Sequence, residues 1–179
     1  KIEKGEYEIT DDSTLKDDAE NARWAWRPLE ASTRLQDQTQ QFQLFIDSPA
    51  FTPEFLTEFL LNYHFHAEHV MSNYSAHGNH LLFQAQRMLY AGTFFPEFKR
   101  AKAWRESGVQ IMNTEIGKQV YADGGHYELC PHYHLASINI FIKALNVATL
   151  NGFRDDFPQS QRKIFCCSVL CRCGDRAHA

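Results

Sequence analysis

The chain has 179 residues, of which 44% are hydrophobic and 13% aromatic, and its formal net charge is −4. This length suits one domain with its own core, and the apolar content excludes a disordered chain. The negative charge excludes a globally basic protein that coats nucleic acid, so no nucleic-acid partner is expected.

The first part of the chain shows no core pattern. Residues 1–20 are charged and are expected to lie outside the domain core. The chain opens at Lys1 without a visible signal peptide, which says little about export because a processed product also lacks one. No apolar run reaches the ~20 residues that span a bilayer, so no membrane partner is expected.

Proline starts and 3.6-residue apolar spacing predict five helices after this segment. Pro28 suits a first helical position, and Thr52-Pro53 reads as a cap followed by a first-turn proline. Gly92 is expected to stop the third helix, and Gly124-Gly125 the fourth. The predicted helices cover residues 28–46, 53–74, 79–91, 96–123 and 131–151. The expected fold is all-α, built from antiparallel helical hairpins.

Three histidines in the second helix raise the question of a metal site. His66 and His69 share one helix face, but His64 lies about 200° from His66 at the ideal helical period. The HExxH pattern of zinc proteases is absent. Helix packing or surface exposure is therefore the preferred interpretation, and no metal is expected.

The end of the chain is rich in cysteine. Four of the five cysteines are crowded at positions 166, 167, 171 and 173, in a spacing that matches no standard zinc site. An odd number, unevenly placed, does not indicate a disulfide framework either. The composition also changes here, so we expect residues 159–179 to be a non-native or variant Cys-rich tail rather than a metal site. A serine-triad hydrolase is disfavoured because no GxSxG elbow is present.

Two polar loops that run into helices hold the chemical candidates. The loop ending in HGNH supplies Asn79 and His80, and the loop DGGHYELCPHYH supplies Tyr133 and His134. Backbone donors and the helix dipole favour an anionic ligand at such positions. An amide, a phenol and imidazoles suit abstraction of a proton next to a carboxylate. The residues alone leave equal room for Asn79 as a helix cap and Tyr133 as a core residue.

The stretches NHLLFQAQRMLYAG and DGGHYELCPHYH resemble the heparinase II/III family of polysaccharide lyases, and within it the heparan-sulfate lyases. The likeness runs from about Trp24 to Pro158. It implies that residues 21–158 form part of an (α/α) toroid, which in family members is followed by a β-sandwich. The family's carboxylate-neutralising asparagine falls on Asn79 in GNH, and its catalytic tyrosine on Tyr133 in PHYH. Supporting or substrate-binding positions by the same resemblance are His80, His134, Glu128, Arg27, Glu30 and Arg34.

The resemblance implies cleavage of heparan sulfate, or a related uronic-acid glycosaminoglycan, by β-elimination. Most tyrosines are protonated at neutral pH, so a cation such as His80, His134 or Arg27 would favour the phenolate form of the base. The chemistry needs no cofactor or metal, and a periplasmic or secreted monomer is expected.

Two features depart from the family pattern. Cys130 stands where an acid or a small polar residue is expected, and the β-sandwich histidine of the family is absent from this chain. Little activity is therefore expected from the chain alone. The alternatives are an inactive carbohydrate-binding fragment of such a lyase and a helical-repeat interaction scaffold. We also expect Asn79 and Tyr133 to line one cleft.

Overall fold

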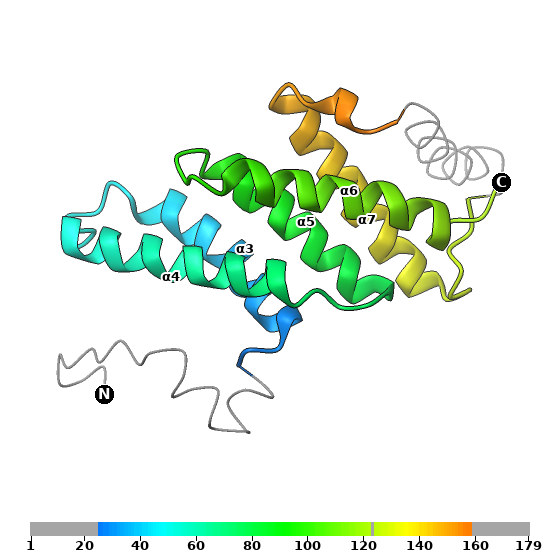
Figure 1. Cartoon of the computed structure of the whole chain (residues 1–179), viewed down its shortest axis with the longest axis horizontal. Coiled ribbons are helices and arrows are strands. Elements are labelled where there is room, and N and C mark those ends of the chain that lie inside the picture. Colours follow the sequence, from blue (N-terminus) through cyan, green and yellow to red (C-terminus); the bar gives the residue numbers. More distant parts are fainter. Residues whose placement is uncertain (1–24, 123, 159–179) are drawn as a thin grey trace, which may run out of the picture.

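The computed structural model describes residues 25–122 and 124–158, which form a helical array (Figure 1). Its elements are α3 (Pro28–Phe45), α4 (Pro53–Ser72), α5 (Gly78–Phe94), α6 (Ala101–Gln119), α7 (Pro131–Leu150) and the short 3-10 helix η2 (Arg154–Asp156). The described residues contain no strand, only one isolated antiparallel bridge between Val120 and His126. The predicted all-α fold is confirmed. Residues 1–20 and 159–179 lie outside the described residues.

Local capping signals place the starts of three helices as predicted. The Thr52 hydroxyl accepts a hydrogen bond from the Phe55 amide at 3.3 Å at the start of α4. Pro28 and Pro131 are the first residues of α3 and α7, where the missing proline N–H costs no intrahelical bond. The observed ends of α3, α4 and α7 lie within two residues of the predicted ones.

The boundaries of α5 and α6 differ from the prediction. Helix α5 continues through Gly92 to Phe94, and α6 begins at Ala101 rather than at Pro96. The Phe95 backbone leaves the helical region at φ −125°, ψ 65°, and its side chain is buried in the core. The connection between the helices is therefore folded onto the core.

Helix α6 also ends earlier than predicted, at Gln119. Val120 is extended, and the Tyr121 amide donates to the Gly125 carbonyl at 2.8 Å. This pairing begins a small hairpin (residues 119–128), which turns the chain toward α7.

Helix α5 is the central element of the array. It contacts α3, α4, α6 and α7, and most of its residues are buried. In Figure 1, α3 flanks it on one side and α7 on the other. An amphipathic helix with one apolar face suits a surface position, whereas α5 is buried on several faces and serves as the core helix.

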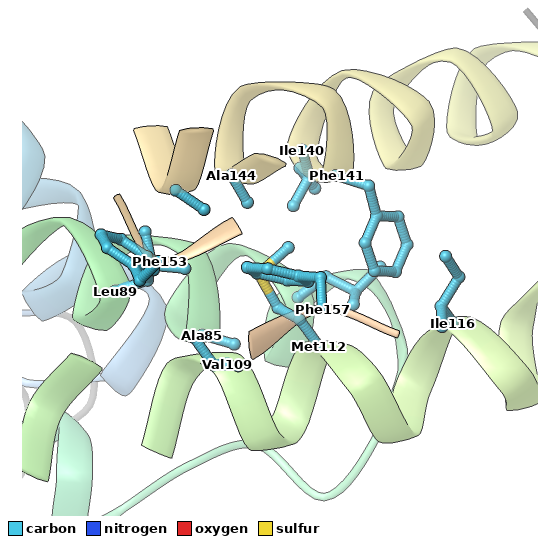
Figure 2. Packing of buried hydrophobic residues seen from close by; sticks show 12 residues of the cluster. Ala85, Leu89, Val109, Met112, Ile116, Ile140, Phe141, Ala144, Phe153 and Phe157 are labelled. Carbon is cyan, nitrogen blue, oxygen red and sulfur yellow. The ribbon is translucent and has the colours of Figure 1, made fainter. Parts of the chain in front are cut away.

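Helix α5 contributes residues to two hydrophobic clusters. In the first, residues from α7 and from the segment after it face α5 and α6, as Figure 2 shows. Its members are Leu82, Ala85, Leu89, Val109, Met112, Ile116, Ile140, Phe141, Ala144, Ala148, Phe153 and Phe157. The second cluster joins α3 and α4 to α5 and consists of Ala31, Leu35, Tyr63, Ala67, Val70, Met88, Ala91, Phe95 and Trp104.

A buried arginine fixes α3 against α5. The Arg87 guanidinium donates to the Ser32 hydroxyl at 2.9 Å and to the Gln36 side-chain oxygen at 3.3 Å. Burial lowers the pKa of Arg87, while the carboxylates of Asp37 and Glu30 act in the opposite direction. These bonds hold the second and third turns of α3 against α5.

Glycines allow α5 and α6 to approach closely at two points. A Cβ atom added at Gly92 would lie 2.1 Å from the Ala101 carbonyl oxygen and 2.6 Å from the Arg105 nitrogen. One added at Gly108 would lie 2.4 Å from the Ala85 carbonyl oxygen and 2.8 Å from the Leu89 nitrogen. Gly92 therefore serves helix packing, which is why it does not stop α5.

We predict that Gly108→Ala destabilises the protein, because the new methyl group meets backbone atoms of α5 that cannot rotate away. Overpacking of this kind costs about 1–3 kcal/mol, which exceeds the gain in helix propensity of up to ~1 kcal/mol. The midpoint of thermal unfolding, followed by circular dichroism, should fall. Gly117→Ala is the matched control on the same helix, since nothing lies within 4 Å of its added Cβ. An unchanged midpoint for Gly108→Ala would contradict the packing role.

Candidate functional site

Asn79 lies at the N-terminal end of α5. It is the second residue of the helix, after Gly78, and His77 holds the N-cap position without a side-chain capping bond. Asn79 is half-buried and His80 is exposed. The alternative that Asn79 serves as the helix cap is therefore wrong. Asn79 thus stands in the first turn of α5, where backbone N–H groups lack intrahelical partners.

Tyr133 lies in the first turn of α7, three residues after the N-cap Cys130. Its side chain is 41% exposed, so the alternative that it packs in the core is also wrong. The ring of His132 stands edge-on to it at 5.7 Å between centroids. His134, the next residue, is buried, and Glu128 is half-buried in the preceding loop.

The hairpin before α7 contacts the start of α5. The Gln119 side-chain N–H donates to the Gly78 carbonyl oxygen at 3.4 Å and to the Glu115 carboxylate at 2.8 Å. Gly78 has φ +79°, and a Cβ atom at this position would lie 3.6 Å from the Tyr127 hydroxyl. The loop that carries Glu128 thus lies against the residue that precedes Asn79.

His126 closes this polar network. Its Nε2 lies 3.2 Å from the Gln119 side-chain oxygen, and its Nδ1 accepts from the Glu128 amide at 3.4 Å. Burial lowers the pKa of His126 and the nearby His134 acts in the same direction, whereas the Glu128 carboxylate raises it. The neutral ring fits this geometry, because it donates at one nitrogen and accepts at the other.

Arg27 and Glu30 form an ion pair at the start of α3, with the Arg27 Nε donating to the Glu30 carboxylate at 2.6 Å. The hydrogen bond from Arg27 holds the pKa of Glu30 below its usual value, and the nearby His80 acts in the same direction. The start of α3 and the start of α5 are therefore near enough for His80 to influence Glu30.

Arg34 is engaged within the helical array. Its Nε donates to His66 Nε2 at 2.8 Å, its Nη2 donates to the Ala25 carbonyl, and its guanidinium carbon lies 5.5 Å from the Trp26 ring centroid. The Trp26 carbonyl in turn accepts from His69 Nε2 at 2.7 Å. Arg34 thus holds the segment that leads to Arg27, and its supporting role in a site stays a prediction.

The histidines of α4 take packing positions. His66 and His69 contact the segment around Trp26, and His64 packs against Phe98 and Trp104 at 5.8 and 5.6 Å between centroids. No group of three or more His, Cys, Asp or Glu able to hold a metal occurs among residues 25–122 and 124–158. The cysteines at 166–173 fall outside these ranges.

Interactions between the start of α5, the end of α6 and the hairpin connect some of the segments that carry the predicted site residues. Glu30 lies near His80, the Gly78 carbonyl meets Gln119, and His126 is near both Glu128 and His134. The hydrogen bonds among them run from Gly78 through Gln119 to His126 and the Glu128 amide. That Asn79 and Tyr133 line one cleft stays a prediction.

The sequence analysis gave Gln119, His126 and Tyr127 no role, although they connect the two loops. A signal was present in the placement of Gln119 and His126 on either side of the Gly124-Gly125 turn. A turn of this kind pairs the residues that flank it.

None of the helices in the described part of the chain is long and apolar enough to cross a membrane.

Comparisons with known proteins show the family of this chain. The family model Heparinase II/III N-terminus matches residues 8–168. Heparin-sulfate lyase of Bacteroides stercoris is 71% identical over 159 residues, covering 89% of this chain and 24% of that protein. Heparin-sulfate lyase of Pedobacter heparinus is 52% identical over 141 residues, covering 79% of this chain and 21% of that protein.

Solved structures give the same result. Heparinase III, the BT4657 gene product, aligns with a TM-score of 0.79 and 62% identity over 95% of this chain and 26% of its own. Heparan sulfate lyase HepC from Pedobacter heparinus aligns with a TM-score of 0.76 and 48% identity over 86% of this chain and 24% of its own. This chain spans about a quarter of the length of these relatives. It belongs to the heparinase II/III family.

Proposed function

We propose that this chain forms the helical part of a polysaccharide lyase that cleaves heparan sulfate, or a related uronic-acid glycosaminoglycan, by β-elimination. The observation that carries the proposal is the 71% identity over 159 residues with a protein named heparin-sulfate lyase. The residue types at the starts of α5 and α7 support it. In this proposal residues 21–158 belong to a helical toroid, and residues 1–20 and 159–179 lie outside it.

Asn79 neutralises the uronate carboxylate in this mechanism. Removal of the C5 proton places a second negative charge beside an ionised carboxylate, which makes that proton only weakly acidic. Hydrogen bonds from the Asn79 amide and the positive end of α5 stabilise the charge as it spreads into the carboxylate. One preorganised donor of this kind contributes about 3–4 kcal/mol in comparable oxyanion sites.

Tyr133 is the base that takes the C5 proton and the acid that returns a proton to the departing C4 oxygen. The C5–H electron pair forms the C4–C5 double bond as the bond from C4 to the glycosidic oxygen breaks, so no water is consumed. The 41% exposure of its side chain supports access to a polymer. General acid–base catalysis of this kind contributes about 10²–10⁴-fold in rate.

The remaining residues support these two. His80 and His134 bring imidazoles next to Asn79 and Tyr133 in the chain, and the Arg27–Glu30 pair lies at the first turn of α3. Arg34 holds that turn through its bond to His66, and Glu128 precedes α7 in the hairpin. The partner is an anionic polysaccharide bound by a periplasmic or secreted monomer, and the elimination as written proceeds without a cofactor or metal.

The assay that tests the proposal follows the ultraviolet absorbance of the unsaturated uronate formed from heparan sulfate. It is run on this chain and on a chimera in which this chain replaces the matching 159 residues of the Bacteroides stercoris lyase. Product from either protein supports a lyase. Binding to immobilised heparan sulfate without product in both proteins would instead favour an inactive carbohydrate-binding fragment. Absence of both binding and product would favour an interaction scaffold.

We predict that Tyr133→Phe lowers kcat in the chimera by about 10²–10⁴-fold, because the proton-transferring oxygen is removed. Affinity for heparan sulfate oligosaccharides, measured by calorimetry, should stay near that of the parent because the ring is kept. Tyr121→Phe, at an exposed tyrosine of the preceding hairpin, is the matched control and should keep full activity. Full turnover by Tyr133→Phe would exclude Tyr133 as the base.

We predict that Asn79→Ala lowers kcat by about 10²–10³-fold, because the developing charge loses its amide donor. The loss should appear mainly in kcat, since an interaction made in the transition state leaves ground-state binding nearly unchanged. Asn146→Ala, at an exposed position of α7, is the control. An equal loss of affinity and rate would show that Asn79 binds substrate uniformly and has no part in the chemistry.

A further inference from the structure

We infer that Gln119 is a positioning residue that ties the loop before Asn79 to the loop before Tyr133. The inference rests on the proposed function, because it concerns how the two reactive side chains are held relative to each other. Gln119 itself is 3% exposed and ends α6. It therefore acts through its neighbours rather than through contact with substrate.

Both ends of the Gln119 carboxamide are engaged. Its N–H groups donate to the Gly78 carbonyl oxygen at 3.4 Å and to the Glu115 carboxylate at 2.8 Å, and its oxygen lies 3.2 Å from His126 Nε2. The Gly78 carbonyl and the carboxylate accept only, so the amide nitrogen must face them. One side chain thus connects α5, α6 and the hairpin.

Glu115 sets the orientation of this amide. Its carboxylate is 5% exposed and also accepts from the Lys118 ammonium at 2.8 Å. A buried carboxylate needs such donors, because leaving it unpaired costs several kcal/mol. Turning the Gln119 amide over would place its oxygen against this carboxylate. The arrangement is therefore fixed from within α6.

His126 transmits the orientation to the hairpin. Since the Gln119 oxygen only accepts, His126 must donate from Nε2, which leaves Nδ1 to accept from the Glu128 amide. The backbone follows the same path, as the Tyr127 amide donates to the Gln119 carbonyl at 2.9 Å. Side chain and backbone of one residue therefore place the segment that leads into α7.

Gly78 receives the other side of this connection. Its φ of +79° is one that residues with a side chain rarely adopt, and the Tyr127 hydroxyl lies 3.6 Å from the position of the absent Cβ. The Gly78 carbonyl that accepts from Gln119 and the backbone N–H of Asn79 belong to the same peptide group. Movement of that peptide would displace the Asn79 side chain directly.

The kinetic test uses Gln119→Leu in the chimera described above, with Gln110→Leu as the matched control at an exposed position of the same helix. Misplacement of reacting groups by about 1 Å costs on the order of 10²-fold in rate, so kcat should fall roughly 10–100-fold while KM changes little. Gln119→Asn keeps the amide but shortens the side chain, and it should likewise lower kcat with little change in KM. Full kcat in a folded Gln119→Asn variant would overturn the inference.

Hydrogen–deuterium exchange on the 179-residue chain separates this inference from the proposed function. Gln119→Leu should speed exchange in residues 124–130 and leave α3 unchanged, whereas Gln110→Leu should change neither. Unchanged exchange in residues 124–130 would overturn the inference. If the parent chimera makes no unsaturated product, the proposed lyase function is contradicted. The exchange measurement still decides whether Gln119 holds the two loops together.

Discussion

The register between α5 and α6 is the constraint on which the rest of the structure depends. Gly108 lies against Leu89, and Gln119 lies against Gly78. Gln119 follows Gly108 by eleven residues, and Gly78 precedes Leu89 by eleven, which is about three turns in each helix. The close glycine contact therefore fixes, three turns away, which residue of α6 meets the start of α5. A shift of either helix would remove Gln119 from the Gly78 carbonyl.

Some parts of this fold could be predicted because their signals are local. The cap at Thr52 and the prolines at 28 and 131 act on the turn in which they stand, so helix starts follow from neighbouring residues alone. The extent of α5 did not follow in the same way. In the local sequence, a glycine that ends a helix and a glycine that allows close helix packing look alike. Gly92 can be assigned to packing only when the position of α6 is known.

In the candidate site, too, some features follow from local sequence and others depend on packing between helices. Asn79 and Tyr133 were expected at helix starts, and both occupy first turns. The bond of Arg34 to His66, 32 residues away, has no counterpart in sequence spacing. Nor does the side-chain bond from Gln119 to Gly78, which depends on the packing of two complete helices. Hydrogen bonds between side chains of different helices cannot be predicted from sequence patterns that describe one helix at a time.

The contribution of α5 to both hydrophobic clusters has a consequence for cooperativity. Leu82, Ala85 and Leu89 belong to one cluster, and Met88 and Ala91 belong to the other. Because these residues share one short helix, α5 cannot leave one cluster without weakening the other. A domain whose halves share a buried element tends to unfold as one unit rather than in separate parts. The start of α5, with Asn79, thus belongs to a helix whose opening requires the loss of both clusters.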